Sequence, residues 1–217
     1  MIRAENIEKS FNGERVLKSV SLEIGRGEYV SVMGKSGSGK STLISILGGF
    51  LSPDSGRVLW DGEDISSFDE KKSAALRSSK LGFVFQSFKL IPTLNARDNL
   101  FLPATLGRHI NGETLRYADE VTAELGISEL LDKYPAMLSG GQCQRVAIAR
   151  SLIYKPEILI LDEPTGALDS DMERRVMNML SRINKELGTT VVQVTHSLAV
   201  AEYGDRIIQI KDGEIGI

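Results

Sequence analysis

A glycine-rich segment near the start of the chain constrains the fold more than any other feature. It matches the phosphate-binding-loop pattern GxxxxGK[ST] in full, and its residues are Gly34, Lys35, Ser36, Gly37, Ser38, Gly39, Lys40 and Ser41. Residues 28–33 before it are predicted to form a strand, and residues 41–50 after it a helix. The order strand, loop, helix is the context that this pattern requires, and it favours phosphate binding over an ordinary glycine turn.

The chemistry of such a loop gives roles to three of its residues. Glycines let backbone N–H groups converge on phosphate oxygens, and the amino end of the following helix adds a favourable dipole. Lys40 is expected to neutralise the β- and γ-phosphates of a nucleotide, and the Ser41 hydroxyl to ligate Mg²⁺. Thr42 is expected to donate a hydrogen bond to the α-phosphate.

Two adjacent carboxylates follow a buried-type strand later in the chain. Residues 158–161 form a continuous apolar run, typical of a strand buried on both faces of a parallel sheet, and Asp162 and Glu163 come directly after it. Adjacent strand residues point to opposite sides, so the two carboxylates have different roles unless the strand ends between them. We predict that Asp162 holds Mg²⁺ through water and that Glu163 is the general base. The alternative is an acidic strand end that caps the following turn.

Strands and helices alternate along the rest of the chain. The first sixty residues are predicted to form short strands separated by glycine turns, and residues from about 87 to 150 a mainly helical lobe. Residues 117–125 have helical spacing in that lobe. Asp169-Ser170 can cap a later helix that ends at Gly188, and its expected apolar face comprises Met172, Val176, Met179, Leu180, Ile183 and Leu187.

The C-terminal part is predicted to contain a strand and a hairpin. Residues 191–195 are apolar enough for a buried strand, and residues 207–215 have the pattern of a hairpin with its turn at Asp212-Gly213. Strands alternating with helices in this way favour a parallel sheet.

The composition is that of an ordinary globular protein, and it disfavours several classes of function. Of the 217 residues, 41% are hydrophobic and 25% charged, and a net charge of −3 gives no reason to expect a nucleic-acid partner. Cys143 is the only cysteine, which excludes an internal disulfide or a cysteine-based zinc cage and favours the cytoplasm. Neither a signal-peptide stretch nor a run of about 18 apolar residues occurs, so we expect membrane association only through a partner.

Together with further short motifs, these features resemble the ATP-binding-cassette (ABC) ATPases over essentially the whole chain. In the order typical of that family, the motifs are Gly34 to Ser41 (Walker A), Gln86 (Q-loop), Leu138-Ser139-Gly140-Gly141-Gln142 (signature), Ile158 to Glu163 (Walker B), Gly166-Ala167-Leu168-Asp169 (D-loop) and His196 (switch histidine). The signature alone would be an ordinary N-capped turn, and the motifs around it give it its meaning.

The resemblance implies a fold and a domain plan. The expected fold is α/β, a P-loop NTPase of the ABC type, with a RecA-like parallel-sheet core, an N-terminal antiparallel β subdomain and an inserted helical subdomain. Residues 1–217 would form a single ABC ATPase domain, in which residues 1–86 and 151–217 make the nucleotide-binding core and residues 87–150 the helical subdomain with the signature. The implied cofactors are ATP and Mg²⁺.

The resemblance also implies that a second copy of the chain is a partner. In this family two subunits pair head to tail, and the signature of one covers the ATP on the P-loop of the other. Ser139 would supply a hydroxyl, and Gly140 and Gly141 would let the backbone approach closely. The helix from about Gln142 would aim its positive end at the γ-phosphate.

Three further residues receive roles by resemblance. His196 would contact the γ-phosphate and help to orient Glu163 and the water, whereas alone it reads as a packed, hydrogen-bonded side chain. Gln86 would touch Mg²⁺ and the water, and its loop would pass the nucleotide state to a membrane partner. Phe11 would stack on adenine, with a partly buried core aromatic as an equal alternative.

A few positions stand apart from the expected motifs. Cys143 follows the signature where the family usually has Gln or Glu, and an inert small residue is favoured there over a reactive thiol. Ser197 follows the switch histidine where Asp is common, and neither change removes a catalytic group. His109 and Trp60 are interpreted as structural or surface residues.

Three segments resemble the macrolide-exporter and lipoprotein-release (MacB/LolD-like) branch of the family. They are Ile46–Gly49, Phe85–Leu94 and Asp162–Asp169. In that branch a separate ATPase pairs with an integral membrane permease subunit that carries a large extracytoplasmic domain. The resemblance therefore implies an ATPase bound through its permease to the inner face of the cell membrane, which powers export, extrusion or transmembrane force transmission.

Two other functions are compatible with membership of the family. One is a regulatory ATPase of the cell-division type, which controls wall hydrolases and transports nothing. The other is a soluble ABC ATPase that acts on DNA or ribosomes. That class normally needs coiled coils, zinc modules or tandem cassettes that do not fit in 217 residues, and the acidic balance also disfavours it.

Overall fold

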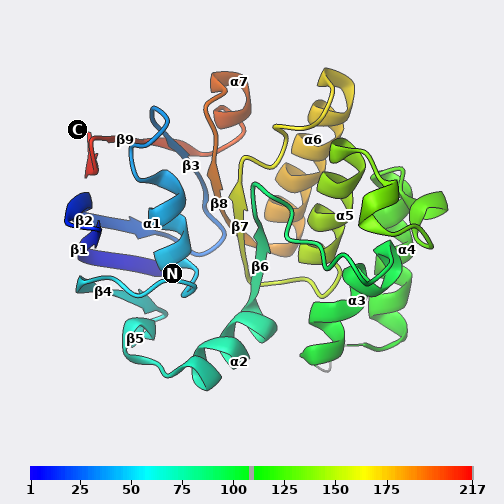
Figure 1. Cartoon of the computed structure of the whole chain (residues 1–217), viewed down its shortest axis with the longest axis horizontal. Helices are drawn as coiled ribbons and strands as arrows, with labels where there is room; N and C mark the ends of the chain where they lie inside the picture. The colour runs from blue at the N-terminus through cyan, green and yellow to red at the C-terminus, as the bar shows by residue number, and fades with distance from the viewer. Residues whose placement is uncertain (108–109, 217) are drawn as a thin grey trace.

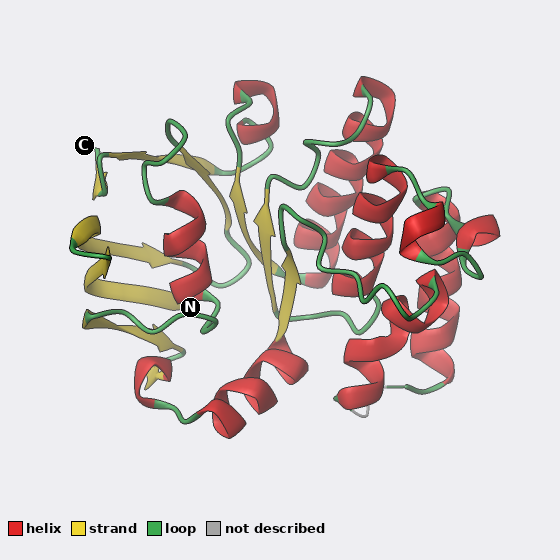
Figure 2. Cartoon of the chain, in the orientation of Figure 1, coloured by secondary structure: helices red, strands yellow, loops and turns green. Residues whose placement is uncertain are grey.

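Two β-sheets form the framework of the computed structural model, which describes residues 1–107 and 110–216 (Figures 1 and 2). The first is antiparallel in the order β2-β1-β4-β5, with β1 (Ile2–Phe11), β2 (Glu14–Ile24), β4 (Ser55–Trp60) and β5 (Glu63–Asp64). The second has the order β10-β9-β3-β8-β7-β6, with β3 (Tyr29–Met33), β6 (Leu81–Val84), β7 (Ile158–Asp162), β8 (Thr190–Val194), β9 (Arg206–Lys211) and β10 (Glu214–Ile215). All its neighbouring strands are parallel except β10 and β9, which form the predicted hairpin.

Helices connect and cover the strands of the parallel sheet. The α-helices are α1 (Lys40–Leu47), α2 (Glu70–Lys80), α3 (Ala96–Leu106), α4 (Gly112–Glu124), α5 (Gly140–Leu152), α6 (Ser170–Leu187) and α7 (Leu198–Ala201). Short 3₁₀ turns lie at Ile65–Ser67, Ser128–Leu130 and Pro135–Met137. All described elements between β6 and β7 are helical, and α4 contains the helix predicted over residues 117–125.

The parallel sheet has a hydrophobic core on each face, and different helices cover the two faces. Alternate residues of β7 belong to different cores: Ile160 packs in the core that contains α1, and Leu161 in the core that contains α5 and α6. Val192 and Val191 of β8 divide in the same way. Helices α1 and α5 therefore lie on opposite faces of the sheet, as Figure 1 shows on either side of β7 and β8.

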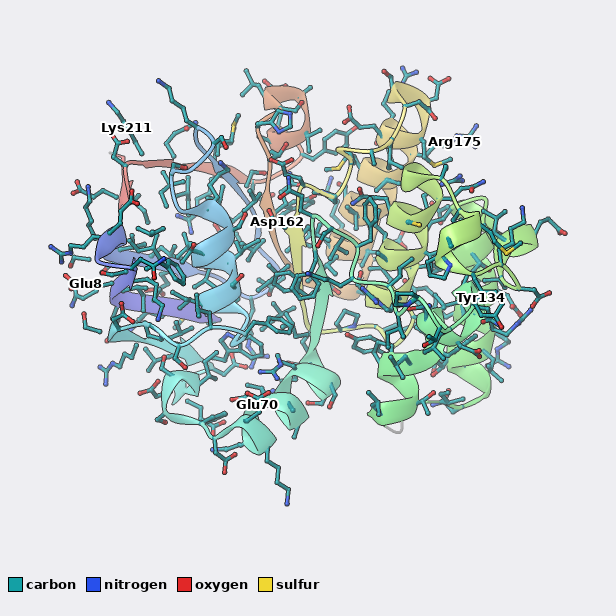
Figure 3. All side chains as sticks on the ribbon, in the orientation of Figure 1. Glu8, Glu70, Tyr134, Asp162, Arg175 and Lys211 are labelled. Carbon is teal, nitrogen blue, oxygen red and sulfur yellow. The ribbon has the colours of Figure 1, made fainter. Side chains whose placement is uncertain are left out.

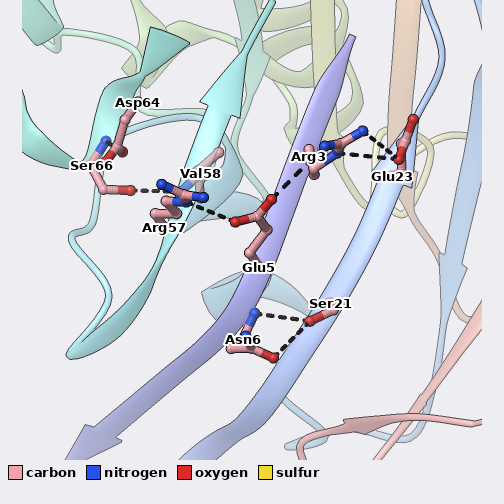
Figure 4. A network of polar contacts seen from close by, with 9 residues as sticks. All are labelled: Arg3, Glu5, Asn6, Ser21, Glu23, Arg57, Val58, Asp64 and Ser66. Carbon is pink, nitrogen blue, oxygen red and sulfur yellow. Dashed lines mark hydrogen bonds and ion pairs between the residues drawn. The ribbon is translucent and has the colours of Figure 1, made fainter. Parts of the chain in front are cut away.

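The two longest strands pair with each other in the antiparallel sheet. β1 has ten residues and β2 eleven, and their ladder contains register shifts of the kind that bend a strand. One shift lies beside Asn6, which has a left-handed φ of 50° and whose N–H donates to Ser21 Oγ at 2.9 Å (Figure 4). Side chains on this sheet pair across the strands, as between Glu5 and Arg57 at 2.7 Å.

Helix α6 confirms most of the predicted apolar face and corrects one member of it. The Asp169 carboxylate accepts hydrogen bonds from Asp171 N and Met172 N, and Gly188 ends the helix with a φ of 67°. Within the predicted face, the buried residues are Val176, Met179, Leu180 and Ile183. Leu187 is 46% exposed, because it is the last helical residue and lies where the chain turns away from the core.

The structure also tests the expectations for Trp60 and for membrane-spanning helices. Trp60 is a core residue whose indole N–H donates to Leu47 O at 3.0 Å, and His109 lies outside the described residues. None of the helices within residues 1–107 and 110–216 is both long and apolar enough to cross a membrane.

Helix α6 offers a test of this packing. Leu180→Ala should lower the free energy of unfolding by about 2–5 kcal/mol, because it leaves a cavity at a fully buried position. Leu187→Ala should change it by less than about 0.5 kcal/mol, because that side chain is half exposed. Urea unfolding followed by circular dichroism measures both values, and equal losses would contradict the packing described for α6.

Candidate active site

The glycine-rich loop connects β3 to α1 and has a backbone that larger residues could not adopt. Gly39 has a φ of 100°, and a Cβ placed there would lie 2.9 Å from Val16 O. A Cβ on Gly34 would come within 2.2 Å of Ile210 O. The loop is thus wrapped tightly between the amino end of α1 and its neighbours, and within it the Ser38 N–H donates to Lys35 O at 3.2 Å.

The Lys40 side chain bends back over this loop. Its Nζ donates to Gly34 O and Lys35 O, both at 2.8 Å, and the residue is only 8% exposed. A buried ammonium close to the loop is placed to meet phosphate oxygens there. Ser41, the next residue, donates through Oγ to Asp162 Oδ1 at 3.3 Å.

A cavity of about 480 Å³ lies over the loop, and residues from four other segments, among them the ends of three strands, complete its lining. Gln86 follows β6, Glu163 follows β7 and His196 follows β8, and all three line the cavity with the loop residues. Parallel strands bring their carboxyl ends to one edge of the sheet, which explains why residues so distant in sequence meet. Figure 3 shows Asp162 at this edge, between the two halves of the molecule.

Residues of the loop also line a second hollow of about 610 Å³. Lys35 and Ser38 lie there with Gly34, Ser36 and His196. The Ser38 hydroxyl is buried and has no hydrogen-bond partner within the described part of the chain. The residues that line both hollows are Gly34, Ser36, Gly37 and His196.

The two carboxylates at the end of β7 have different surroundings. The strand ends at Asp162, and Glu163 adopts a left-handed φ of 49°, so strand alternation does not decide where the Glu163 side chain lies. Burial raises the pKa of the Asp162 carboxyl, while the hydrogen bond from Ser41 and the charge of Lys40 act in the opposite direction. Asp162 thus lies against the loop, in contact with Ser41.

Glu163 lies between two polar side chains. Its Oε1 is 3.2 Å from His196 Nδ1, and its Oε2 accepts a hydrogen bond from Gln86 Nε2 at 3.4 Å. The His196 side chain is 71% exposed. This exposure contradicts the alternative interpretation of His196 as a packed side chain. A carboxylate held between an amide and an imidazole at the mouth of the cavity is suited to accept a proton from water.

Phe11 lies near the cavity without lining it. It pairs with Glu14 in the β1–β2 ladder, and Glu14 and Val16 are among the lining residues. Phe11 is 44% exposed and packs in neither hydrophobic core, so it is partly buried at the surface and is not a core aromatic. Glu14 and Val16 were not anticipated, because no sequence pattern distinguishes them from other residues of β2.

The signature segment begins α5 on the face of the sheet opposite to α1. Ser139 is the N-cap: its Oγ accepts from Gln142 N at 3.2 Å, and Gln142 Oε1 accepts from Ser139 N at 2.9 Å. Gly140 and Gly141 form the first turn of the helix. The Cys143 thiol is buried, which raises its pKa, and this agrees with an inert small residue.

Gly141 packs directly on the D-loop. A Cβ added to Gly141 would lie 2.8 Å from Ala167 O, whereas one added to Gly140 would meet no atom nearer than 4.0 Å. We predict that Gly141→Ala lowers the free energy of unfolding by about 1–3 kcal/mol, because the D-loop backbone must shift. Gly140→Ala is the matched control and should change it by less than about 1 kcal/mol. Urea unfolding measures both, and equal effects would contradict this close approach.

Comparisons with known proteins identify the family. The model of the family described as ABC transporter matches residues 17–166. The lipoprotein-releasing system ATP-binding protein LolD of Aquifex aeolicus is 44% identical over 215 residues, which are 99% of this chain and 96% of that protein. The macrolide export ATP-binding/permease protein MacB of Campylobacter fetus is also 44% identical, over 99% of this chain and 34% of MacB.

Solved structures agree with the sequence comparisons. The dimeric structure of MJ0796, a bacterial ABC transporter cassette, is 43% identical, has a TM-score of 0.95 and covers 100% of this chain and 97% of that one. A second structure of the same cassette, in a post-hydrolysis state bound to ADP and Pi, has a TM-score of 0.94 at 41% identity, with the same coverage of both chains. The chain belongs to the ABC transporter family, in which it is an ATP-binding and ATP-hydrolysing cassette.

Proposed function

We propose that the chain is the ATPase subunit of an export or extrusion complex, in which two copies enclose ATP and drive a membrane permease. The observation that carries this proposal is the position of Glu163. Its carboxylate lies beside Gln86 and His196 and faces the cavity over the phosphate-binding loop.

The loop residues hold the nucleotide in this proposal. Gly34 to Gly39 present their N–H groups to the phosphates, Lys40 neutralises the β- and γ-phosphates, and Thr42 donates to the α-phosphate. Phe11 stacks on the adenine at the edge of the cavity. The 44% exposure of Phe11 supports this role, because a free ring face is needed for stacking.

The metal position follows from the contact between Ser41 and Asp162. No group of three or more His, Cys, Asp or Glu residues that could hold a metal ion occurs within the described ranges. A site made of Ser41, Asp162 through water, Gln86 and phosphate oxygens fits Mg²⁺ bound together with ATP, because Mg²⁺ prefers oxygen ligands and Ser41 already contacts Asp162. When bound, Mg²⁺ neutralises charge on the phosphates.

Glu163 accepts the proton of the attacking water. Gln86 and His196 hold its carboxylate from two sides, and His196 also faces the γ-phosphate. The left-handed backbone of Glu163 turns its side chain out of the line of β7 and toward these two residues. Asp162 remains on the loop side, where it serves the metal.

The signature completes the site of the neighbouring subunit. Ser139 lies at the start of α5, on the face of the sheet opposite to α1, so it is poorly placed to cover the nucleotide on its own Lys40. A second copy related by a twofold axis brings its Ser139, Gly140, Gly141 and Gln142 to this nucleotide. The related cassette MJ0796 was solved as a dimer, which supports this arrangement.

The permease partner would bind beside the Q-loop. Phe85 precedes Gln86 and packs on Phe83, with ring centroids 4.2 Å apart, and both line a groove of about 280 Å³ with Phe50. Arg77 and Lys89 lie in the same groove, which suits an apolar segment with an acidic residue. A permease segment bound there would contact the strand that carries Gln86, and it would hold the ATPase at the inner face of the membrane.

The similar proteins favour export over regulation of wall hydrolases. MacB is named for macrolide export, and LolD for lipoprotein release. By analogy, the permease partner carries a large extracytoplasmic domain.

Within the cassette, residues 1–86 and 151–217 form the nucleotide-binding core and residues 87–150 the helical subdomain.

The Glu163→Gln variant tests the proposed function. The amide keeps the shape of the side chain and cannot accept the proton, so ATP hydrolysis should fall by about 100-fold or more while ATP binding persists. Phosphate release measures turnover, and light scattering at saturating ATP should give the mass of a dimer. Glu157→Gln, an exposed change elsewhere, is the matched control and should retain turnover. Normal turnover in Glu163→Gln would contradict the role of the base.

A further inference from the structure

We propose that Gln144, on α5, is a positioning residue that holds the backbone of Glu163 and so sets the place of its carboxylate. This inference rests on the proposed role of Glu163 as the base. Gln144 lies outside the signature pentapeptide and does not line the cavity described above. Its action is therefore indirect, through the main chain of Glu163.

Glu163 has a backbone conformation that needs support from its surroundings. A left-handed φ in a residue other than glycine costs about 1 kcal/mol or more, and it persists where neighbouring groups fix it. The Glu163 N–H donates to Val194 O at 3.0 Å. Its carbonyl accepts from Gly166 N at 3.3 Å and from Gln144 Nε2 at 3.4 Å. Gln144 supplies the one side chain among these contacts.

The burial of Gln144 supports a role for its hydrogen bond to Glu163 O. The residue is only 1% exposed, and a buried amide is costly unless it is hydrogen-bonded. Within the described part of the chain, the amide's one hydrogen bond is the one to Glu163 O. An apolar side chain would otherwise be the better choice on this face of α5, because Ala147 and Ile148, one turn further along it, are both buried.

Helix α5 meets the turn after β7 at two points. Gly141 packs on Ala167 O, and Gln144, three residues later on the same face, reaches Glu163 O. The helix that begins with Ser139 therefore also supports the base of its own chain. Loss of the Gln144 contact would let the Glu163 backbone relax and its carboxylate move away from Gln86 and His196.

The Gln144→Met variant tests this role. Methionine has a similar length and suits a helix, but it cannot donate a hydrogen bond to Glu163 O. We expect kcat to fall about tenfold, because a misplaced base loses rate, while KM for ATP stays within about twofold of the parent. Asn184→Leu is the matched control: this buried amide donates to Gly27 O and Thr189 O, away from the site. It should lower the melting temperature and leave kcat per folded molecule unchanged.

A double-mutant cycle shows whether Gln144 acts through the carboxylate. In the Glu163→Gln background, Gln144→Met should cause no further loss in single-turnover phosphate formation. An equal loss in both backgrounds, a wild-type kcat in Gln144→Met, or a raised KM with kcat unchanged would overturn the inference. The Glu163→Gln variant alone distinguishes the role of Gln144 from the role of Glu163, because wild-type turnover in that variant would overturn the proposed base itself.

Discussion

Burial of the parallel sheet on both faces is the constraint on which the rest of the molecule depends. Strands β7 and β8 are buried along their whole length, so helices must cover them from both sides. One face receives α1, which carries Lys40, and the other receives α5, which begins at Ser139. The two parts of the proposed nucleotide site therefore lie on opposite faces of the sheet within one chain, and in our proposal a second copy brings them together.

The same sheet gathers the side chains proposed for the chemistry at one edge. Strands β6, β7 and β8 end beside one another, which places Gln86, Glu163 and His196 at one cavity. At the end of β7, Asp162 stays against the loop while the left-handed turn at Glu163 redirects the second carboxylate. The separation of the proposed metal-binding carboxylate from the proposed base thus follows from where the strand ends.

Much of this site could be predicted from the sequence, because short motifs carry its chemistry. Glycines at fixed spacing before Lys40, combined with two carboxylates after an apolar run, strongly indicate a site for phosphate and its metal ion. Helix α2 was not predicted, because it buries none of its residues and so has no apolar period. Leu187 fits the period of α6 but lies at its exposed end. Gln144 was missed, because its contact with Glu163 O arises only from the packing of α5.

The central claim is that the signature of one subunit completes the nucleotide site of the other subunit. Ser139→Arg blocks the signature, Lys40→Ala disables the P-loop, and each variant alone should have no turnover. In an equimolar mixture, half of the dimers are mixed and one of their two sites is intact, so phosphate release should recover to about one quarter of the wild-type rate. A mixture that forms dimers and still has no turnover would contradict the claim.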